Sequence, residues 1–259
     1  MQRNILIESE NARAVVASYR APPRGQRLNN APLVIMPYGL QKTHEHTPAF
    51  FSNISEKLED LGLTSLLYDY HEQQQETPTE QKLCCKKVTG DLNTLFIWAR
   101  ENNFNEVAFI TEGLGAPLLF INLPKNAVFT ILLWPVLSLQ EFAKNQTVAS
   151  QANTDIPDEL CLSKKFFEEM KKHNLRTALK NVHTPTLILQ GQKDNIIPPI
   201  HLEEARAHLM APRLDITTFE DGHHGLAFPK HKKACLQHIS NFVKKYAQDD
   251  SDRTELFRI

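Results

Sequence analysis

Side chains that could carry out acid–base chemistry follow two predicted strands in the second half of the chain. Asp194 comes directly after an apolar strand expected at Thr186 to Gln190. His223 and His224 follow another strand expected at Leu214 to Phe219. A carboxylate that binds one imidazole nitrogen fixes the tautomer of the ring and leaves the other nitrogen to act as a base. Asp194 therefore stands where an acid that orients a histidine would be needed.

A third candidate position lies in the stretch Asn105 to Leu119, NEVAFITEGLGAPLL. It predicts a buried strand at Val107 to Thr111, a sharp turn at Glu112 to Leu114, and then a helix, because the apolar run is short and small residues follow at once. Small residues around one central position are typical of the nucleophile elbow, G-x-S-x-G, whose central serine is the nucleophile. Here the central residue is Gly113, which has no side chain to act as a nucleophile.

The elements around these positions alternate between strands and helices. Further apolar strands are expected at 33–36, 64–70 and 128–134, and helices with apolar residues on one face at 50–61, 83–100 and 235–246. An opening hairpin is expected from 4–8 and 14–19. Nearly all-apolar strands that alternate with helices indicate an α/β fold with a mostly parallel sheet covered on both faces. Function in such sheets lies beyond the carboxyl ends of the strands.

In this order, the features resemble the α/β-hydrolase family, in particular its serine aminopeptidase-like, lysophospholipase-like and acyl-thioesterase-like branch. The resemblance covers nearly everything from Leu33 to Tyr246. It rests on the elbow and on three further motifs, namely Pro37-Tyr38-Gly39 where the family often has His-Gly, Gly191 to Pro198, and His224-Gly225. Elbow, acid and histidine also follow the chain order of that family.

The resemblance implies a role for each matching residue. Asp194 would be the acid and His224 the base of a Ser-His-Asp triad. His224 is preferred to His223 because family members usually place the catalytic histidine directly before the small residue that corresponds to Gly225. The backbone N–H groups of Leu40 and Leu114 would form the oxyanion hole.

Gly113 at the nucleophile position excludes ordinary acyl-enzyme chemistry. In a related triad, loss of the serine costs about a millionfold in turnover. Three explanations stay open. Hydrolysis has been lost, the glycine is a laboratory substitution in an active enzyme, or His224 and Asp194 activate water directly.

The same residues also have purely structural interpretations. Asp194 could close a turn ahead of Pro198, and His224 could be an ordinary loop histidine. Glu112, beside the central glycine, is expected to be a local hydrogen-bond partner of the turn rather than a catalytic residue. The geometry of the folded chain must decide between these alternatives.

Composition narrows the class of partner. The 29 basic and 30 acidic side chains give a net charge of −1, so the charge favours neither nucleic acid nor an anionic membrane as a partner. A small, neutral or amphipathic partner is expected instead, and the family resemblance implies an acyl or ester ligand. The N-terminal sequence MQRNILIESENARAV does not read as a signal peptide, and no apolar run is long enough to span a bilayer.

The four cysteines, Cys84, Cys85, Cys161 and Cys235, lack the spacing of a metal site. That pattern indicates free thiols in a reducing compartment, and we expect a cytoplasmic protein.

Neither a cofactor nor a metal is expected. A dinucleotide site at Gly113-Leu114-Gly115 fails because Leu118 occupies the third glycine position of that motif. His44, His46 and the pair His223-His224 also lack the spacing of a defined zinc motif.

The 259 residues fit one large domain. We expect a domain at 1–247 with a small helical insert at about 139–182, followed by a mobile tail at 248–259. Phe166, Phe167, Met170, Leu175 and Leu179 lie at helical spacing in the insert. They predict either simple packing against the body or a lid over a pocket.

Two functions of different classes remain. The first is a hydrolase lineage acting on carboxylic esters or acyl thioesters, with the nucleophile replaced by glycine and activity lost or removed. The second is a non-catalytic protein that binds an acyl or other small hydrophobic ligand on the same fold.

Overall fold

The structure is a computed structural model that describes residues 2–8, 14–38, 47–70, 85–144 and 164–247. Its strands are β1 Gln2–Ile7, β2 Val15–Arg20, β3 Leu33–Tyr38, β4 Ser65–Asp69, β5 Val107–Glu112, β6 Ala127–Leu133, β7 Thr186–Gly191 and β8 Leu214–Phe219. Its helices are α1 Thr47–Asp60, α3 Cys85–Glu101, α4 Gly115–Ile121, α6 Lys164–Lys171, α7 Leu175–Lys180, α8 Ile200–His208, the 3₁₀ helix η2 His224–Leu226 and α9 Pro229–Ala247.

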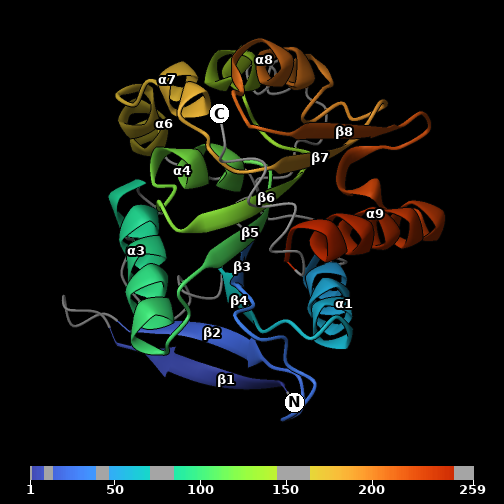
Figure 1. Cartoon of the computed structure of the whole chain (residues 1–259). Coiled ribbons are helices and arrows are strands. Elements are labelled where there is room, and N and C mark those ends of the chain that lie inside the picture. The colour runs from blue at the N-terminus through green and yellow to red at the C-terminus, as the bar shows by residue number, and fades with distance from the viewer. Residues whose placement is uncertain (1, 9–13, 39–46, 71–84, 145–163, 248–259) are drawn as a thin grey trace.

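The strands form one eight-stranded sheet in the order β1-β2-β4-β3-β5-β6-β7-β8 (Figure 1). β1 pairs antiparallel with β2, and β2 pairs antiparallel with β4. All pairings from β4 through β8 are parallel. The carboxyl ends of β5, β7 and β8 therefore meet at one edge of the sheet, which is where the predicted site residues follow.

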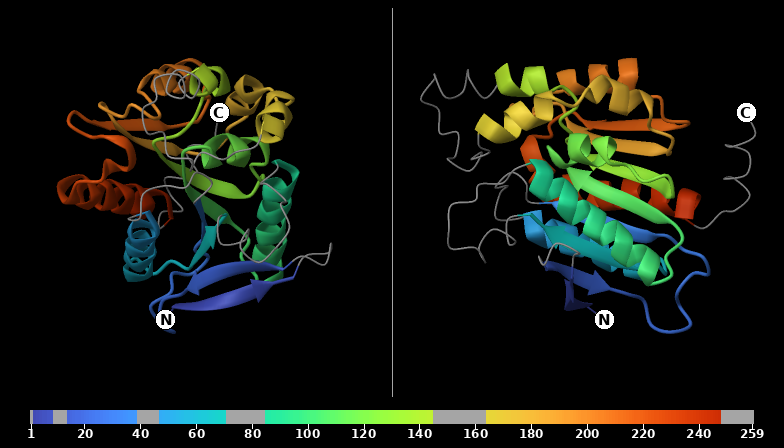
Figure 2. Two further views of the ribbon diagram at one scale, coloured as in Figure 1. Left: turned by 180° about the vertical axis from the view of Figure 1, so that it is seen from behind. Right: turned by 90° about the vertical axis from the view of Figure 1, so that its left-hand side faces the viewer.

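Helices cover both faces of the sheet. α1 and α9 pack together on one face, and α3, α4, α7 and α8 lie on the other (Figures 1 and 2). β5, in the middle of the sheet, has the sequence VAFITE and is buried at every position. Its continuous apolar run matches a strand that is covered on both faces.

The predicted fold class is confirmed, and most predicted elements agree with the structure to within a few residues. The closing helix is an exception, because α9 begins at Pro229 rather than at Cys235. Its buried first-turn side chain is His231, so the apolar pattern starts late. Proline at the first helical position needs no N–H partner, which suits this start. The turn expected between the first two strands, and the segment around Gly39, lie outside the described residues.

Two further differences concern the end of the sheet. α8 was not predicted from the sequence because its buried residues are His201, Leu202 and Ala205, a weak hydrophobic pattern. β8, with the sequence LDITTF, is only half-buried along its whole length. It is the edge strand of the sheet, so the expectation of nearly all-apolar, fully covered strands does not hold there.

The described part of the insert is packed against the body. Phe166 and Met170 of α6 are fully buried, as is Leu179 of α7. α6 contacts α3, and α7 contacts α4 and α8. A lid role for the insert stays a prediction, and residues 145–163 and the tail at 248–259 lie outside the described residues. Among the described helices, none combines the length and the apolar character that crossing a bilayer requires.

Candidate active site

The turn after β5 has the backbone of the predicted elbow. Gly113 has a φ of 49°, in the left-handed region that glycine adopts without a steric penalty. Its N–H donates to Leu133 O at 3.1 Å, and its carbonyl accepts from Val136 N at 2.9 Å and Ala116 N at 3.3 Å. The turn is therefore fixed from both sides by the chain that leaves β6.

The helix after this turn lies unusually close to the strand before it. A Cβ on Gly115 would lie 2.1 Å from Oγ1 of Thr111, a distance that no side chain tolerates. Thr111 itself donates to Pro37 O at 2.8 Å. The prediction that small residues let helix and strand approach here therefore fits the geometry. Leu114 is buried at the start of α4.

Asp194 lies in the loop after β7 and is 3% exposed. Its Oδ1 accepts the N–H groups of Ile196 at 3.0 Å and Ile197 at 2.8 Å. Its Oδ2 accepts from Nε2 of Gln190 at 3.2 Å. One carboxylate oxygen therefore closes the local turn, and the other is directed toward the neighbouring loop.

That neighbouring loop carries His224, which is 6% exposed. Its Nδ1 lies 2.9 Å from Oδ2 of Asp194. Because the carboxylate can only accept, this contact selects the tautomer of the neutral ring that carries its proton on Nδ1 and has Nε2 as the acceptor. His223 is exposed on the same loop. Of the two predicted histidines, the structure brings His224 to the acid.

The loops that carry this pair touch through glycines. A Cβ on Gly191, the last residue of β7, would lie 2.3 Å from the carbonyl oxygen of Gly222. Gly222 O also accepts from Lys193 N at 2.8 Å. The β7 and β8 loops are thus held together at the point from which Asp194 and His224 extend.

Trp134, the first residue after β6, lies beside this pair and was missed by sequence reasoning. Its ring centroid is 6.1 Å from that of His224, edge to face, and 6.4 Å from that of Phe50, in a stacked arrangement. It is 1% exposed and has a φ of 37°. No sequence signal marked it, because it ends an ordinary apolar strand.

His201 of α8 ties the acid loop to the segment after β6. Its Nδ1 accepts from Leu137 N at 3.2 Å and Ser138 N at 3.0 Å. Burial lowers the pKa of His201 to about 4, although the carboxylates of Asp194, Glu141 and Glu204 raise it in part. The ring is therefore neutral near pH 7, with its proton on Nε2.

The remaining predicted site residues are only partly described. Leu40, predicted as an oxyanion-hole donor, lies outside the described residues, as do His44 and His46. Glu112 is buried at the end of β5. Within the described parts of the chain, no group of three His, Cys, Asp or Glu side chains could hold a metal ion. Two cysteines, Cys85 and Cys235, are described, and both are buried thiols.

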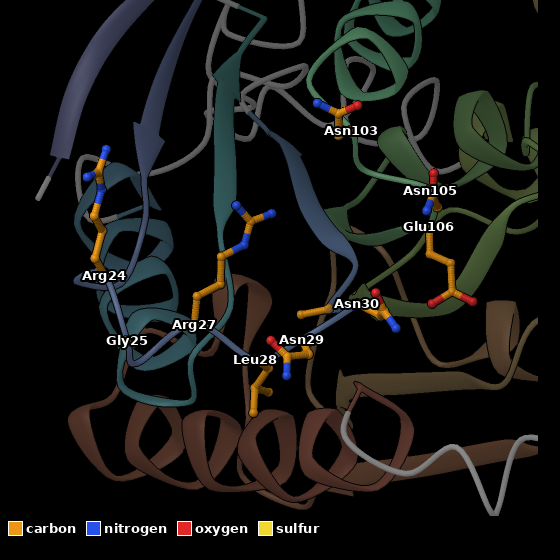
Figure 3. Close-up of a pocket in the computed structure, with 10 residues that line it drawn as sticks. Arg24, Gly25, Arg27, Leu28, Asn29, Asn30, Asn103, Asn105 and Glu106 are labelled. Carbon is orange, nitrogen blue, oxygen red and sulfur yellow. The ribbon is translucent and has the colours of Figure 1, made fainter.

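A pocket of about 820 Å³ lies at the opposite edge of the sheet, where β3 and β5 begin. Arg24, Arg27 and Asn30 line it from one segment, and Asn103 and Glu106 from another (Figure 3). None of the predicted site residues lines this pocket. It is therefore separate from the candidate active site.

The chain has an α/β-hydrolase fold. This follows from the order of the strands, from the turn after β5, and from the loops after β7 and β8 that carry Asp194 and His224. A sequence profile of the prolyl oligopeptidase family matches residues 131–250. This match begins inside β6, includes Asp194 and His224, and leaves out Gly113. No curated protein sequence matches the chain.

Solved structures share the fold over almost the whole chain. The esterase domain of a Rhodothermus marinus protein superposes with a TM-score of 0.72 at 11% identity, covering 95% of this chain and 99% of that one. Est1E from Butyrivibrio proteoclasticus superposes with a TM-score of 0.72 at 14% identity, covering 93% of this chain and 97% of that one. Alpha/beta hydrolase domain-containing protein 10 from mouse superposes with a TM-score of 0.70 at 15% identity, covering 94% of this chain and 99% of that one.

Proposed function

We propose that this chain descends from hydrolases of carboxylic esters or acyl thioesters and has glycine in place of the nucleophile, so that acyl-enzyme turnover is absent. The structural neighbours named as esterases support the choice of ester chemistry. A small acyl or ester compound is the proposed ligand. Neither a cofactor nor a metal enters the proposal.

One observation carries this proposal. A buried Asp194–His224 pair, joined at 2.9 Å, stands at the same sheet edge as a glycine turn with the backbone of an elbow. The segment after β6 connects the two, because it hydrogen-bonds Gly113 and places Trp134 against the His224 ring. This arrangement supports the proposal that Asp194 and His224 are the acid and base of a triad and that Gly113 occupies the nucleophile position.

The proposed roles follow from the chemistry of acyl transfer. Asp194 would hold His224 in the tautomer whose Nε2 accepts a proton, and it would stabilise the imidazolium that forms. The backbone N–H groups of Leu114 and Leu40 would stabilise the negative oxygen of a tetrahedral intermediate. A serine at position 113 would supply the attacking oxygen.

Glycine removes only that last component. Without an Oγ, no covalent acyl-enzyme can form, and the remaining groups can bind an acyl compound or direct a water molecule to it. Residual rate from such groups is several orders of magnitude below that of a complete triad. Binding without turnover is therefore the second candidate function, and the absence of a nucleophile at Gly113 favours it.

The test restores the missing atom. Gly113→Ser should react with a serine-directed fluorophosphonate and hydrolyse a series of acyl esters of increasing chain length. Gly113→Ala is the matched control, because it introduces the same backbone strain without a nucleophile. The parent protein and Gly113→Ala should neither react with the label nor turn over.

A Gly113→Ser variant that folds but does not react would contradict the proposed hydrolase lineage of this site. In that case the binding function becomes the better account of the same edge. Turnover by the parent itself, at a rate that Gly113→Ala does not change, would instead show that His224 and Asp194 activate water.

A further inference from the structure

Trp134 combines two unusual features. Its φ of 37° is left-handed, a conformation that is strained for a bulky residue. Its indole Nε1 is buried and has no hydrogen-bond partner within the described parts of the chain, although buried polar groups are nearly always satisfied. A buried donor without an acceptor destabilises the folded state further. The backbone strain and the unmatched donor thus belong to the same residue.

Strain of this kind is concentrated at the candidate site. Four non-glycine residues among the described ones have a positive φ, and two of them, Asn30 and Asn103, are asparagines, which tolerate it. The other two are Trp134 and Leu226. Leu226 belongs to the 3₁₀ helix that starts at His224. The residues with the greater strain therefore flank the acid–base pair.

The backbone around Trp134 explains why it stays in this conformation. Trp134 N donates to Leu189 O at 2.8 Å. On either side of it, Leu133 O accepts from the N–H of Gly113 and Val136 N donates to the carbonyl of Gly113. These bonds hold the residue between β5 and β7. Its ring is then fixed between Phe50 and His224.

We propose that the indole N–H of Trp134 is a ligand-binding donor that orients an acyl compound by hydrogen-bonding its carbonyl or carboxylate oxygen beside His224. This inference rests on the proposed function and deepens it, because it names a residue that recognises the ligand. Trp134 is a positioning residue in this scheme and takes no part in bond breaking.

The chemistry of the donor selects the ligand. An indole N–H can only donate, so its partner must be an acceptor. The ring stacks on Phe50 and is almost fully shielded from water, so the acceptor must belong to a molecule with an apolar part. A carboxylic acid or ester with an alkyl chain meets both requirements, and an alkyl ammonium meets only the second.

The direct test follows the indole N–H signals of the ¹⁵N-labelled parent protein by NMR. The chain has two tryptophans, Trp98 and Trp134, and the Trp98→Phe variant assigns their signals. Octanoate is the probe, and octylamine is the control with the same chain and no acceptor in its protonated form. Octanoate should move the Trp134 signal downfield, with the Trp98 signal and the octylamine titration unchanged.

A pair of variants supplies the affinity measurement. Trp134→Phe keeps an aromatic ring and removes the donor, and we expect octanoate to bind at least about tenfold more weakly, as for other hydrogen bonds to a charged group. Trp98→Phe should bind as the parent does. If Trp134→Phe fails to fold, the NMR titration of the parent protein with octanoate still decides whether the indole N–H binds the ligand.

Two outcomes would overturn the inference, namely a Trp134 signal that octanoate leaves unmoved and one that octylamine shifts equally. Fluorophosphonate labelling of Gly113→Ser does not depend on this donor. Labelling without an octanoate shift therefore removes the Trp134 inference and keeps the proposed function. An octanoate shift without labelling keeps Trp134 as a ligand donor and removes the hydrolase lineage.

Discussion

The turn after β5 and the loops after β7 and β8 form two sides of the same sheet edge. The first side has a glycine at its centre, and the second carries the hydrogen-bonded pair of Asp194 and His224. The family match divides the chain in the same way, since it includes Asp194 and His224 and stops short of Gly113. Backbone geometry, in contrast, is well formed on both sides.

The difference reflects what each side needs in order to stay folded. The left-handed turn at Gly113 is held by backbone hydrogen bonds, so the side chain at its centre is not required. Asp194 and His224 depend on each other, because removing one partner of a buried pair leaves an unmatched polar group or charge. Asp194 also binds two backbone N–H groups of its own turn. The pair therefore has a structural role in the two loops that carry it.

The largest predicted effect tests whether the pair still works once a nucleophile is supplied. Asp194→Asn, made in the Gly113→Ser background, should lower kcat for a 4-nitrophenyl ester by about 10⁴-fold, because the amide no longer fixes the right tautomer of His224. Steady-state kinetics of the two variants measure this ratio.

Asp91→Asn in the same background is the matched control. Asp91 is also a buried aspartate, but it binds the hydroxyl of Tyr68 on another part of the sheet. Its substitution should leave kcat nearly unchanged. Equal losses for both substitutions would show that Asp194 acts through stability alone.

The fold and the acid–base pair were accessible from the sequence because each has a local signal. Apolar runs of strand length marked β5 and β7, and the small residues at Gly113 and Gly115 marked the turn. Asp194 and His224 lie in the loops after predicted strands, so the expectation of parallel strands was enough to place them at one edge.

The missing parts depend on contacts between distant segments. Trp134 is an ordinary end to an apolar strand in the sequence, and its strain and unmatched N–H arise only when β5 and β7 fix it on both sides. His201 lies in a helix with a weak hydrophobic pattern. Its role depends on the N–H groups of Leu137 and Ser138, more than sixty residues away in sequence.

The predicted effect of intermediate size is the pH dependence of stability that His201 causes. His201 connects the loop after β7 to the segment after β6. Its pKa is about 4 in the folded protein and about 6.5 in the unfolded chain. Below pH 6.5 the unfolded chain binds a proton that the folded protein does not, so stability is full above that pH and falls as the pH drops toward 4. This group contributes a loss on the order of 3 kcal/mol at most.

Urea unfolding between pH 7 and pH 4.5 measures how steeply the free energy of unfolding falls with pH. His201→Asn removes the titrating group, and its stability should depend less steeply on pH than that of the parent. The comparison uses the slopes, because the substitution also changes stability at neutral pH. Parallel curves for the two proteins would mean that His201 is protonated equally easily in both states.

The smallest predicted effect is a loss of stability when Gly113, in the turn after β5, is replaced. Gly113→Ser and Gly113→Ala should each lower the free energy of unfolding by about 1 to 2 kcal/mol, because a left-handed φ of 49° is unfavourable for any residue with a Cβ. Melting temperatures and urea midpoints measure the change. If the turn has the strain of an elbow, serine and alanine must cost about the same, since both carry the same Cβ. A melting temperature that rises in both variants would show that the turn relaxes away from the left-handed conformation, and the elbow assignment would then fail.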